Sequence, residues 1–324
     1  MDRLLEVENL ETHLRTREGL IKAVDGVSFF VRPGESMGLV GESGSGKTMT
    51  ALSIMRLVPS PPGKVVGGKV ILDGEDLMSL SSREMLQRRA TKVSMIFQDP
   101  MTSLDPTMKV GRQVAEPMEI HLGMSQDEAI QRAVELLERV GVPAARRRVE
   151  DYPHQFSGGM RQRVMIAIAL SCRPKLLIAD EPTTALDVTV QAQFLDLVRE
   201  LRQELGMALL WITHDLGVVA ELCDKAAVMY GGRIVEFGPL QTVLSQPRHR
   251  YTAALLRSIP TMEKRREDRL EAIRGLPPDL SRLPEGCPFR PRCDFATSEC
   301  QEMRPGLEQV AAEHYSACLN PQTY

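Results

Sequence analysis

One eight-residue segment constrains the fold of this 324-residue chain more than any other feature: GESGSGKT, at positions 41–48. It fits the phosphate-loop pattern G-x-x-x-x-G-K-[ST], follows the apolar run 37–40 and precedes a helix-compatible run, 48–57. Glycines let backbone amides turn toward a phosphate, and the following helix contributes its N-terminal dipole. The segment therefore predicts a phosphate site with Mg²⁺, in which Lys47 supplies charge and Thr48 a hydroxyl for the metal. Its residues are Gly41, Glu42, Ser43, Gly44, Ser45, Gly46, Lys47 and Thr48.

Polar residues also follow three apolar runs that read as buried strands, at 92–97, 175–180 and 208–213. The second run ends in Asp180 and Glu181, a pair that by itself could simply cap the next helix. Beside a phosphate loop, Asp180 is placed to hold Mg²⁺ through water and Glu181 to polarise an attacking water. Gln98 is a candidate neutral ligand near the metal. His214 ends the third run, either as a structural histidine or at the rim where α/β sheets bind ligands.

A second glycine-containing segment, FSGGMRQR at 156–163, leads into an apolar-rich helix. Ser157, Gly158 and Gly159 would then lie at an exposed helix N-terminus, where backbone amides attract anions. The alternative is an ordinary serine N-cap followed by loop glycines.

The order of apolar runs predicts an α/β fold with a largely parallel sheet, because strands alternate with helical stretches after the phosphate loop. Short β-runs at 4–10, 27–31 and 36–41 predict a sheet-rich N-terminal region. The segment from about Asp99 to Arg173 is helical in character and contains a capping box, Ser125 with Glu128. An apolar stripe over 190–205 predicts a helix packed on the sheet.

Composition excludes several classes of protein. The chain is 43% hydrophobic, which argues against disorder, and 40 basic against 43 acidic residues leave no net field for nucleic acid. The first ten residues show no signal-peptide core, and the longest apolar run, Val164 to Cys172, is too short to span a bilayer. Six cysteines are few for a secreted disulfide scaffold. The cytosolic side of a membrane is the expected location.

Strand patterns end near Leu244, and the mixed-charge run 263–274 predicts a solvated linker helix. Beyond Gly275 the chain is rich in proline, glycine and cysteine, in the spacing C-x5-C-x6-C-x17-C. Four thiolates suit Zn²⁺ or an iron–sulfur cluster, whereas two disulfides do not suit a reducing compartment. Spacing alone does not choose between an iron–sulfur cluster, Zn²⁺ and four cysteines without a metal. The four are Cys287, Cys293, Cys300 and Cys318, while Cys172 and Cys223 are expected to be small buried hydrophobes.

Taken in order, GESGSGKT, Gln98, FSGGMRQR, LLIADEP, TALD and His214 resemble the ATP-binding cassette of an ABC transporter over roughly residues 4–245. The resemblance implies a P-loop ATPase with a RecA-like parallel-sheet core, an N-terminal antiparallel β subdomain and a helical subdomain at about 99–173. It also implies that two cassettes close head to tail on ATP and Mg²⁺, with Glu181 as general base and His214 as the γ-phosphate sensor. The resemblance further implies that Thr48, Gln98 and Asp180 bind Mg²⁺ and that His13 stacks on adenine. Asp187 would belong to the loop that joins the two ATP sites. The residues implied to contact the ATP of the partner cassette are Ser157, Gly158, Gly159 and Gln162.

A closer resemblance, to the ATPase subunits of oligopeptide and dipeptide permeases, rests on the segments 97–117, 246–260 and GCPFRPRCDFATSEC. It implies a cassette at 1–245 and a short irregular Cys-rich C-terminal extension at 246–324, which in some members of the family carries a [4Fe-4S] cluster. The implied partners are a second, paralogous ATPase subunit, two transmembrane permease subunits and an extracytoplasmic solute-binding protein. Docking through the loop after Gln98 would place the chain at the cytoplasmic face of the membrane.

Other functions stay open at this point. The same machinery could import nickel chelates, glutathione or another small solute, since the ATPase does not touch the cargo. A non-transport ATPase of repair or translation usually shows duplicated cassettes or a long coiled-coil insertion, and neither is present in the sequence. A third alternative treats the cysteine-rich tail as a redox or metal sensor that regulates a pump.

Overall fold

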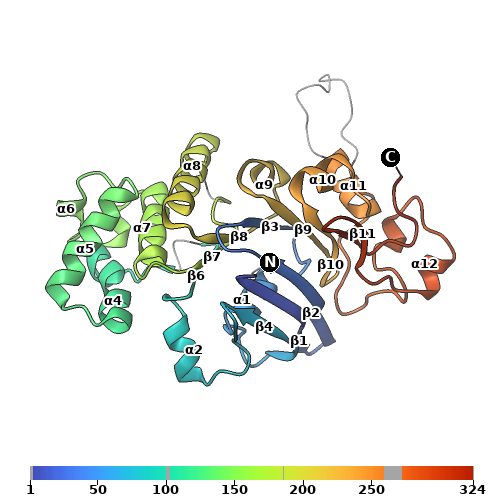
Figure 1. Ribbon diagram of the computed structural model, residues 1–324, viewed down its shortest axis with the longest axis horizontal. Helices are drawn as coiled ribbons and strands as arrows, with labels where there is room; N and C mark the ends of the chain where they lie inside the picture. The colour runs from blue at the N-terminus through green and yellow to red at the C-terminus, as the bar shows by residue number, and fades with distance from the viewer. Residues whose placement is uncertain (1–2, 100–102, 185, 259–271, 324) are drawn as a thin grey trace. The chain divides into compact units, whose positions relative to one another are not determined.

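The computed structural model describes residues 3–99, 103–184, 186–258 and 272–323. The chain forms two compact units, each built from several segments (Figure 1). Unit 1 contains residues 1–4, 32–35 and 72–210, and unit 2 contains residues 5–31, 36–71 and 211–324. Each unit therefore draws on distant parts of the sequence.

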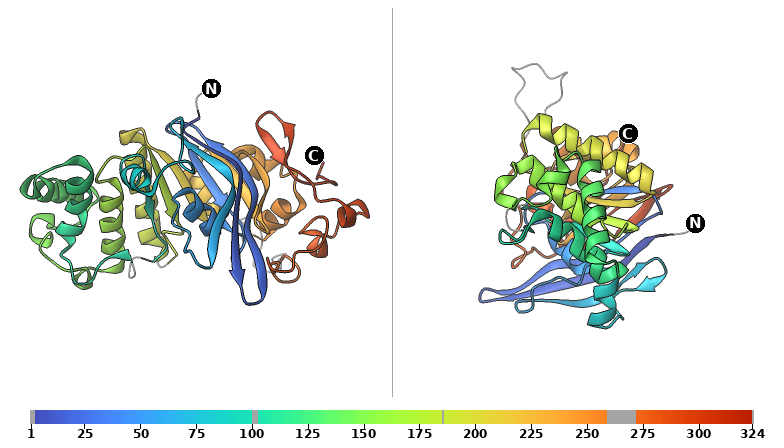
Figure 2. Two further views of the ribbon diagram at one scale, coloured as in Figure 1. Left: turned by 90° about the horizontal axis from the view of Figure 1, so that it is seen from below. Right: turned by 90° about the vertical axis from the view of Figure 1, so that its left-hand side faces the viewer.

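An antiparallel sheet in unit 2 contains the first two strands of the chain. Strand β1 (Leu5–Thr16) pairs with β2 (Gly19–Val31) in a long hairpin, and β4 (Gly63–Leu72) lies on the other side of β1 (Figure 2). Burial alternates along β1, as expected when one face of a sheet is covered. The predicted sheet-rich N-terminal region is confirmed, although β4 is not among the predicted strands.

The second sheet of unit 2 is mixed. Strand β3 (Ser36–Val40) runs parallel to β9 (Lys225–Tyr230), and all residues of both strands are buried. Helix α9 (Leu216–Leu222) packs so closely that a Cβ at Gly38 would lie 2.5 Å from a Val219 methyl group. This close approach explains a glycine in the centre of a strand.

The same sheet continues into the C-terminal region. Strand β10 (Arg233–Pro239) pairs antiparallel with β9 and with β12 (His314–Ser316), which in turn pairs with β11 (Glu308–Ala311). The expectation that strands end near Leu244 is therefore wrong. The short strand β12 carries no recognisable apolar pattern, and all four residues of β11 are exposed, so their pairing depends on the edge that β10 offers.

Unit 1 combines parallel strands with a helical region. Strand β6 (Val93–Ile96) runs parallel to β7 (Leu176–Asp180), and β8 (Ala208–Thr213), which starts in this unit, neighbours β7. The three buried strands predicted from their apolar runs are confirmed. Helix α8 (Val188–Leu205) buries its apolar stripe, including Phe194, Val198 and Leu201.

The predicted helical insertion is also confirmed within the described residues. It contains α4 (Val110–Leu122), α5 (Gln126–Arg139), α6 (Ala145–Arg148), the 3-10 turn η1 (Pro153–Gln155) and α7 (Gly158–Leu170). Ser125 and Glu128 form the expected capping box at the start of α5, with reciprocal bonds between side chain and backbone.

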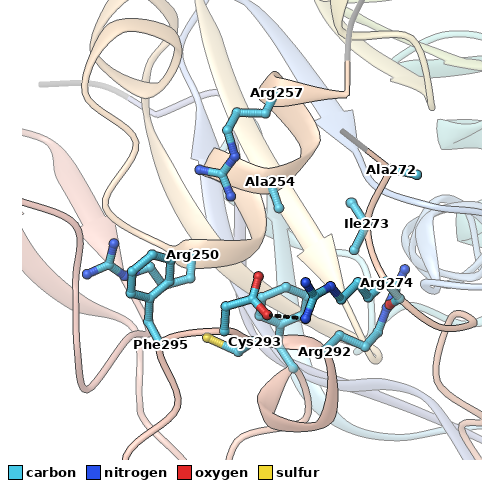
Figure 3. A pocket seen from close by; sticks show the side chains of 11 residues that line it. Arg250, Ala254, Arg257, Ala272, Ile273, Arg274, Arg292, Cys293 and Phe295 are labelled. Atoms are coloured by element: carbon cyan, nitrogen blue, oxygen red, sulfur yellow. Dashed lines mark hydrogen bonds and ion pairs between the residues drawn. The ribbon is translucent and has the colours of Figure 1, made fainter. Parts of the chain in front are cut away.

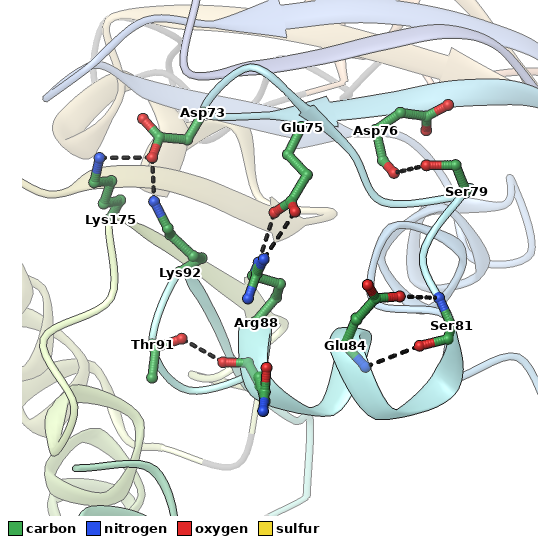
Figure 4. A network of polar contacts seen from close by, with 11 residues as sticks. Asp73, Glu75, Asp76, Ser79, Ser81, Glu84, Arg88, Thr91, Lys92 and Lys175 are labelled. Carbon is green, nitrogen blue, oxygen red and sulfur yellow. Dashed lines mark hydrogen bonds and ion pairs between the residues drawn. The ribbon is translucent and has the colours of Figure 1, made fainter.

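Unit 1 also contains a network of polar and charged residues (Figure 4). It includes β5 (Glu75–Asp76) and α2 (Ser82–Arg88), whose N-terminus has its own capping box from Ser81 and Glu84. Asp73 forms ion pairs with Lys92 and with Lys175, the latter at 2.7 Å. These contacts tie the segment before β6 to the segment before β7.

The C-terminal region is largely irregular. Beyond α10 (Leu240–Ser245) and α11 (Arg250–Arg257), residues 272–323 contain only the 3-10 turn η2 (Arg290–Arg292), α12 (Glu299–Glu302) and the short strands β11 and β12. Most of the predicted linker helix, 263–271, lies outside the described residues, and residues 272–274 are not helical. Cys172 and Cys223 are buried, as expected. Among the helices that the structure describes, none is long and apolar enough to cross a membrane.

Candidate active site

The phosphate loop lies in unit 2 between β3 and α1 (Lys47–Ile54). A Cβ at Gly41 would come within 2.2 Å of the Met229 carbonyl oxygen, and one at Gly46 within 2.2 Å of the Ala23 carbonyl oxygen. Both glycines also have positive φ angles, 157° and 107°. Only glycine fits at these two positions, because backbone from two neighbouring strands presses against the loop.

Lys47 is buried, with 4% of its surface exposed, and its Nζ contacts the backbone of the loop. It donates to the carbonyl oxygens of Gly41 at 2.8 Å and Glu42 at 3.1 Å. The buried hydroxyl of Ser45 has no hydrogen-bond partner within the described chain. Thr48 is exposed at the first turn of α1. An ammonium group, a spare hydroxyl and a helix N-terminus are the donor set that a nucleotide phosphate with Mg²⁺ requires.

A second group of predicted residues lies in unit 1. Asp180 is buried at the end of β7, and Glu181 follows it with a strained positive φ of 44°. Gln98 Nε2 donates to Glu181 Oε2 at 3.3 Å, so the structure brings together two residues that lie 83 positions apart. Thr184 was not predicted, although its hydroxyl donates to the same Oε2 at 3.2 Å. Strained backbone of this kind is concentrated at functional sites.

The FSGGMRQR segment begins helix α7, also in unit 1. Ser157 is its N-cap and accepts a bond from the amide of Met160 at 3.4 Å. Gly158 has open space on its Cβ side. Gln162 is buried and donates to the Pro182 carbonyl oxygen at 2.8 Å, while its own carbonyl oxygen has no partner in the described part of the chain. The helix is thereby fixed to the residue next to Glu181.

Three further predicted residues occupy separate positions. Asp187 caps α8 by accepting from the amide of Val190 at 2.9 Å, in unit 1. His214 is exposed immediately after β8, in unit 2. His13 is half-buried on β1 in unit 2, and its Nε2 has no partner within the described residues. Its neighbour Thr12 bonds Ser53 of α1 at 2.6 Å, which joins this strand to the helix that follows the phosphate loop.

The four C-terminal cysteines are free thiols in unit 2. Burial raises the pKa of Cys287 to about 11, and neighbouring cysteines contribute to the same shift. Burial likewise raises the pKa of Cys293 and Cys318. The backbone links this region internally, since the Cys287 amide donates to the Cys300 carbonyl oxygen at 2.9 Å. Within the described ranges, however, no three His, Cys, Asp or Glu side chains are grouped as metal ligands.

The sulfur atoms of three of these cysteines accept backbone hydrogen bonds. Cys287 accepts from the amides of Phe289 and Arg290, and Cys293 accepts from Phe295. Cys318 accepts from Arg250 and Asn320. Amide donors of this kind lower the pKa of a thiol, but burial is the larger effect, so all three pKa values remain raised.

Two segments of the chain match known protein families. The family "ABC transporter" matches residues 24–184, and the family "Oligopeptide/dipeptide transporter, C-terminal region" matches residues 235–300. Among solved structures, the ATP-binding cassette MJ0796, a dimer in a post-hydrolysis state bound to ADP and Pi, is similar with a TM-score of 0.65 and 28% identity. The match covers 73% of this chain and 98% of that one. The fold is that of an ATP-binding cassette, as predicted.

Curated relatives are similar over almost the entire chain. The oligopeptide transport ATP-binding protein OppD of Salmonella typhimurium is 50% identical, over 98% of this chain and 94% of the relative. OppD of Bacillus subtilis is also 50% identical, over 97% of this chain and 87% of the relative. The chain belongs to the ABC transporter family and, within it, to the ATP-binding proteins of the oligopeptide/dipeptide transporters.

Proposed function

We propose that this chain is the ATP-hydrolysing subunit of an importer for oligopeptides or dipeptides. The observation that carries the proposal is the 50% identity to oligopeptide transport ATP-binding proteins, which includes the region beyond the cassette. The cassette part explains ATP hydrolysis, whereas the C-terminal region distinguishes this family from other cassettes. Import of nickel chelates, glutathione or another small solute by the same machinery is the alternative.

The residues divide the chemistry among them. The phosphate loop binds the nucleotide phosphates through its amides and Lys47, and bound Mg²⁺ neutralises phosphate charge. Thr48, Asp180 and Gln98 are the candidate metal ligands. Glu181 accepts the proton of the attacking water, and the bonds from Gln98 and Thr184 orient its carboxylate.

Other residues in the proposal bind the nucleotide from outside the loop. His214 senses the γ-phosphate, and His13 stacks on adenine with its half-buried ring. A second, paralogous cassette would use Ser157, Gly158, Gly159 and Gln162 of this chain to complete its own ATP site, with Asp187 in the connecting loop.

Further partners follow from the same assignment. Two transmembrane permease subunits would hold the chain at the cytoplasmic face of the membrane, and an extracytoplasmic binding protein would deliver the cargo. The cassette is proposed to occupy residues 1–245 and the C-terminal extension residues 246–324. No nucleic acid is involved.

For the C-terminal extension we propose a metal site at Cys287, Cys293, Cys300 and Cys318, with a [4Fe-4S] cluster as the first candidate and Zn²⁺ as the second. The support is the set of backbone amides that donate to three of the sulfur atoms. The thiols would have to lose their protons and move together on binding.

The central test is Glu181→Gln, which keeps the size and hydrogen bonding of the side chain but removes its basicity. We expect ATP hydrolysis to fall by about 10² to 10⁴-fold, while equilibrium binding of MgATP is preserved. Glu135→Gln, a change in a solvent-exposed ion pair with Arg132, is the matched control and should leave hydrolysis unchanged. Full turnover in the Glu181 variant would refute the role of this residue.

The cargo requires the assembled transporter. In reconstituted vesicles, ATP hydrolysis should be stimulated by a binding protein loaded with a short peptide. Stimulation by nickel chelates or glutathione instead of peptides would favour the alternative importer.

A further inference from the structure

The C-terminal extension contacts the phosphate loop directly. The guanidinium of Arg292 binds both carboxylate oxygens of Glu42, with Nη1 at 2.6 Å from Oε2 and Nη2 at 2.9 Å from Oε1. Only 6% of the Arg292 side chain and 22% of the Glu42 side chain are exposed. Glu42 is the second residue of the loop, so a buried two-pronged ion pair joins the loop to a residue 250 positions away.

A second contact from the same region holds the backbone of Glu42. Its amide donates to the hydroxyl of Tyr251 at 3.0 Å, and its carbonyl oxygen accepts from Lys47. Tyr251 belongs to a cluster of three rings with Tyr230 and Phe289, whose centroids lie 4.5 to 5.3 Å apart. Glu42 is therefore fixed at its amide, its carbonyl and its carboxylate.

The negative charge of Glu42 means that its pairing with Arg292 affects nucleotide binding. A carboxylate in a phosphate-binding loop repels nucleotide phosphates, and the repulsion is strong where water is partly excluded. Arg292 neutralises that charge and also bonds the Tyr230 hydroxyl at 3.5 Å, which fixes the guanidinium between the loop and the ring cluster. Without Arg292, Glu42 would be an unpaired negative charge beside the incoming phosphates.

We infer that Arg292 is a positioning residue for nucleotide binding: it neutralises Glu42 and holds the phosphate loop in its binding conformation. The inference rests on the proposed function, since it assumes that the loop binds ATP. Arg292 ends the turn η2 and directly precedes Cys293, and both line a cavity of about 410 Å³ in the extension (Figure 3). The extension thus contributes to the ATP site of its own chain.

The test compares MgATP affinity in four full-length variants by equilibrium titration. We expect Arg292→Gln to weaken binding about tenfold, because the Glu42 carboxylate that it leaves unpaired repels the nucleotide phosphates. Glu42→Gln should weaken binding less than Arg292→Gln, because the charge that it leaves unpaired is a guanidinium, which attracts phosphate, and not a carboxylate, which repels it. The double variant should resemble Glu42→Gln and regain most of the loss. Arg304→Gln is the control, since Arg304 also lies in the extension but binds Asp25 and not the loop.

The difference in MgATP affinity between the two single variants distinguishes a role of Arg292 in nucleotide binding from a purely structural ion pair. If the ion pair only stabilised the extension, both single variants and the control would lose affinity alike, and that result would overturn the inference. Unchanged affinity in Arg292→Gln would overturn it as well. If Arg292→Gln fails to fold, the double variant, which lacks both charges, decides the question. A tenfold lower MgATP affinity of the double variant than of Glu42→Gln would contradict the inference that Arg292 acts by neutralising Glu42. Wild-type protein that binds no MgATP would instead refute the proposed function.

Discussion

At the scale of single residues, the phosphate loop contains buried polar side chains that can donate to an anion. Lys47 is held by two carbonyl oxygens of its own loop, and the Ser45 hydroxyl has no partner among the described residues. Both groups can donate hydrogen bonds, and a charged donor such as the Lys47 ammonium bonds a phosphate more strongly than it bonds a neutral carbonyl.

We therefore predict that Lys47→Ala weakens MgATP binding by about 10- to 100-fold, which corresponds to the loss of one charged hydrogen bond or two. Titration with a fluorescent nucleotide measures the change. Lys175→Ala, which removes a half-exposed partner of Asp73, is the control and should bind nucleotide normally. Equal affinity of the Lys47 variant and the wild type would count against the phosphate loop as the nucleotide site.

At the scale of elements, the C-terminal extension is attached to the cassette sheets by specific polar contacts as well as by β-pairing. Asp25, buried on β2, binds Arg233 of β10 at 2.8 Å and Arg304 of the extension at 3.4 Å. Burial raises the pKa of Asp25, but the hydrogen bond and charge of Arg233, with Lys22 and Arg304, outweigh it and hold the pKa below its ordinary value. The ionised carboxylate therefore stabilises the folded state.

The sign of this effect predicts a pH dependence. Because the folded-state pKa is lowered, the stabilisation is complete above pH ~4 and is lost as the pH falls through the folded-state value. Asp25→Asn should lower the free energy of unfolding by about 1–2 kcal/mol at pH 7, and the difference from wild type should shrink toward pH ~2. Urea unfolding at both pH values measures it.

The control for that experiment is Asp294→Asn, which breaks an ion pair with Arg274 that is largely exposed. Such a pair is worth about 0–1 kcal/mol, so little change is expected. A difference between Asp25→Asn and wild type that grows on acidification would contradict the assigned pKa direction.

At the scale of the whole molecule, the proposed metal site of the cysteine-rich region would link metal binding to the structure of the C-terminal extension. Its backbone amides already point at three of the sulfur atoms, while burial keeps those thiols protonated in the metal-free chain. Metal binding would thus be coupled to proton release and to local rearrangement of the extension.

We predict that protein purified without oxygen contains iron and sulfide near four of each per chain, or about one zinc if the second candidate holds. Cys318→Ser should reduce the metal content strongly, whereas Cys223→Ser, a change at a buried cysteine of α9's C-terminus, should not. Iron, sulfide and zinc assays with an absorption spectrum decide between the outcomes. Absence of all three would remove the metal site.

Much of the fold was predictable because its patterns are local. The strands β6, β7 and β8 are continuous apolar runs, and Ser125 with Glu128 is a capping box readable within four residues. Strands β11 and β12 were missed because they have no apolar pattern of their own. They form because β10 presents an edge, and that edge exists only after the sheet has folded.

The sequence by itself determined the family, the order of motifs and the candidate residues for the chemistry, since each motif needs particular side chains at short, fixed spacing. Only the tertiary structure decided which distant groups meet. Gln98 and Glu181, which are 83 positions apart, share a hydrogen bond. Arg292 forms an ion pair with Glu42, from which it is separated by 250 positions. No local pattern encodes such pairs, because they depend on parallel strand ends and on a buried ring cluster that bring remote segments together.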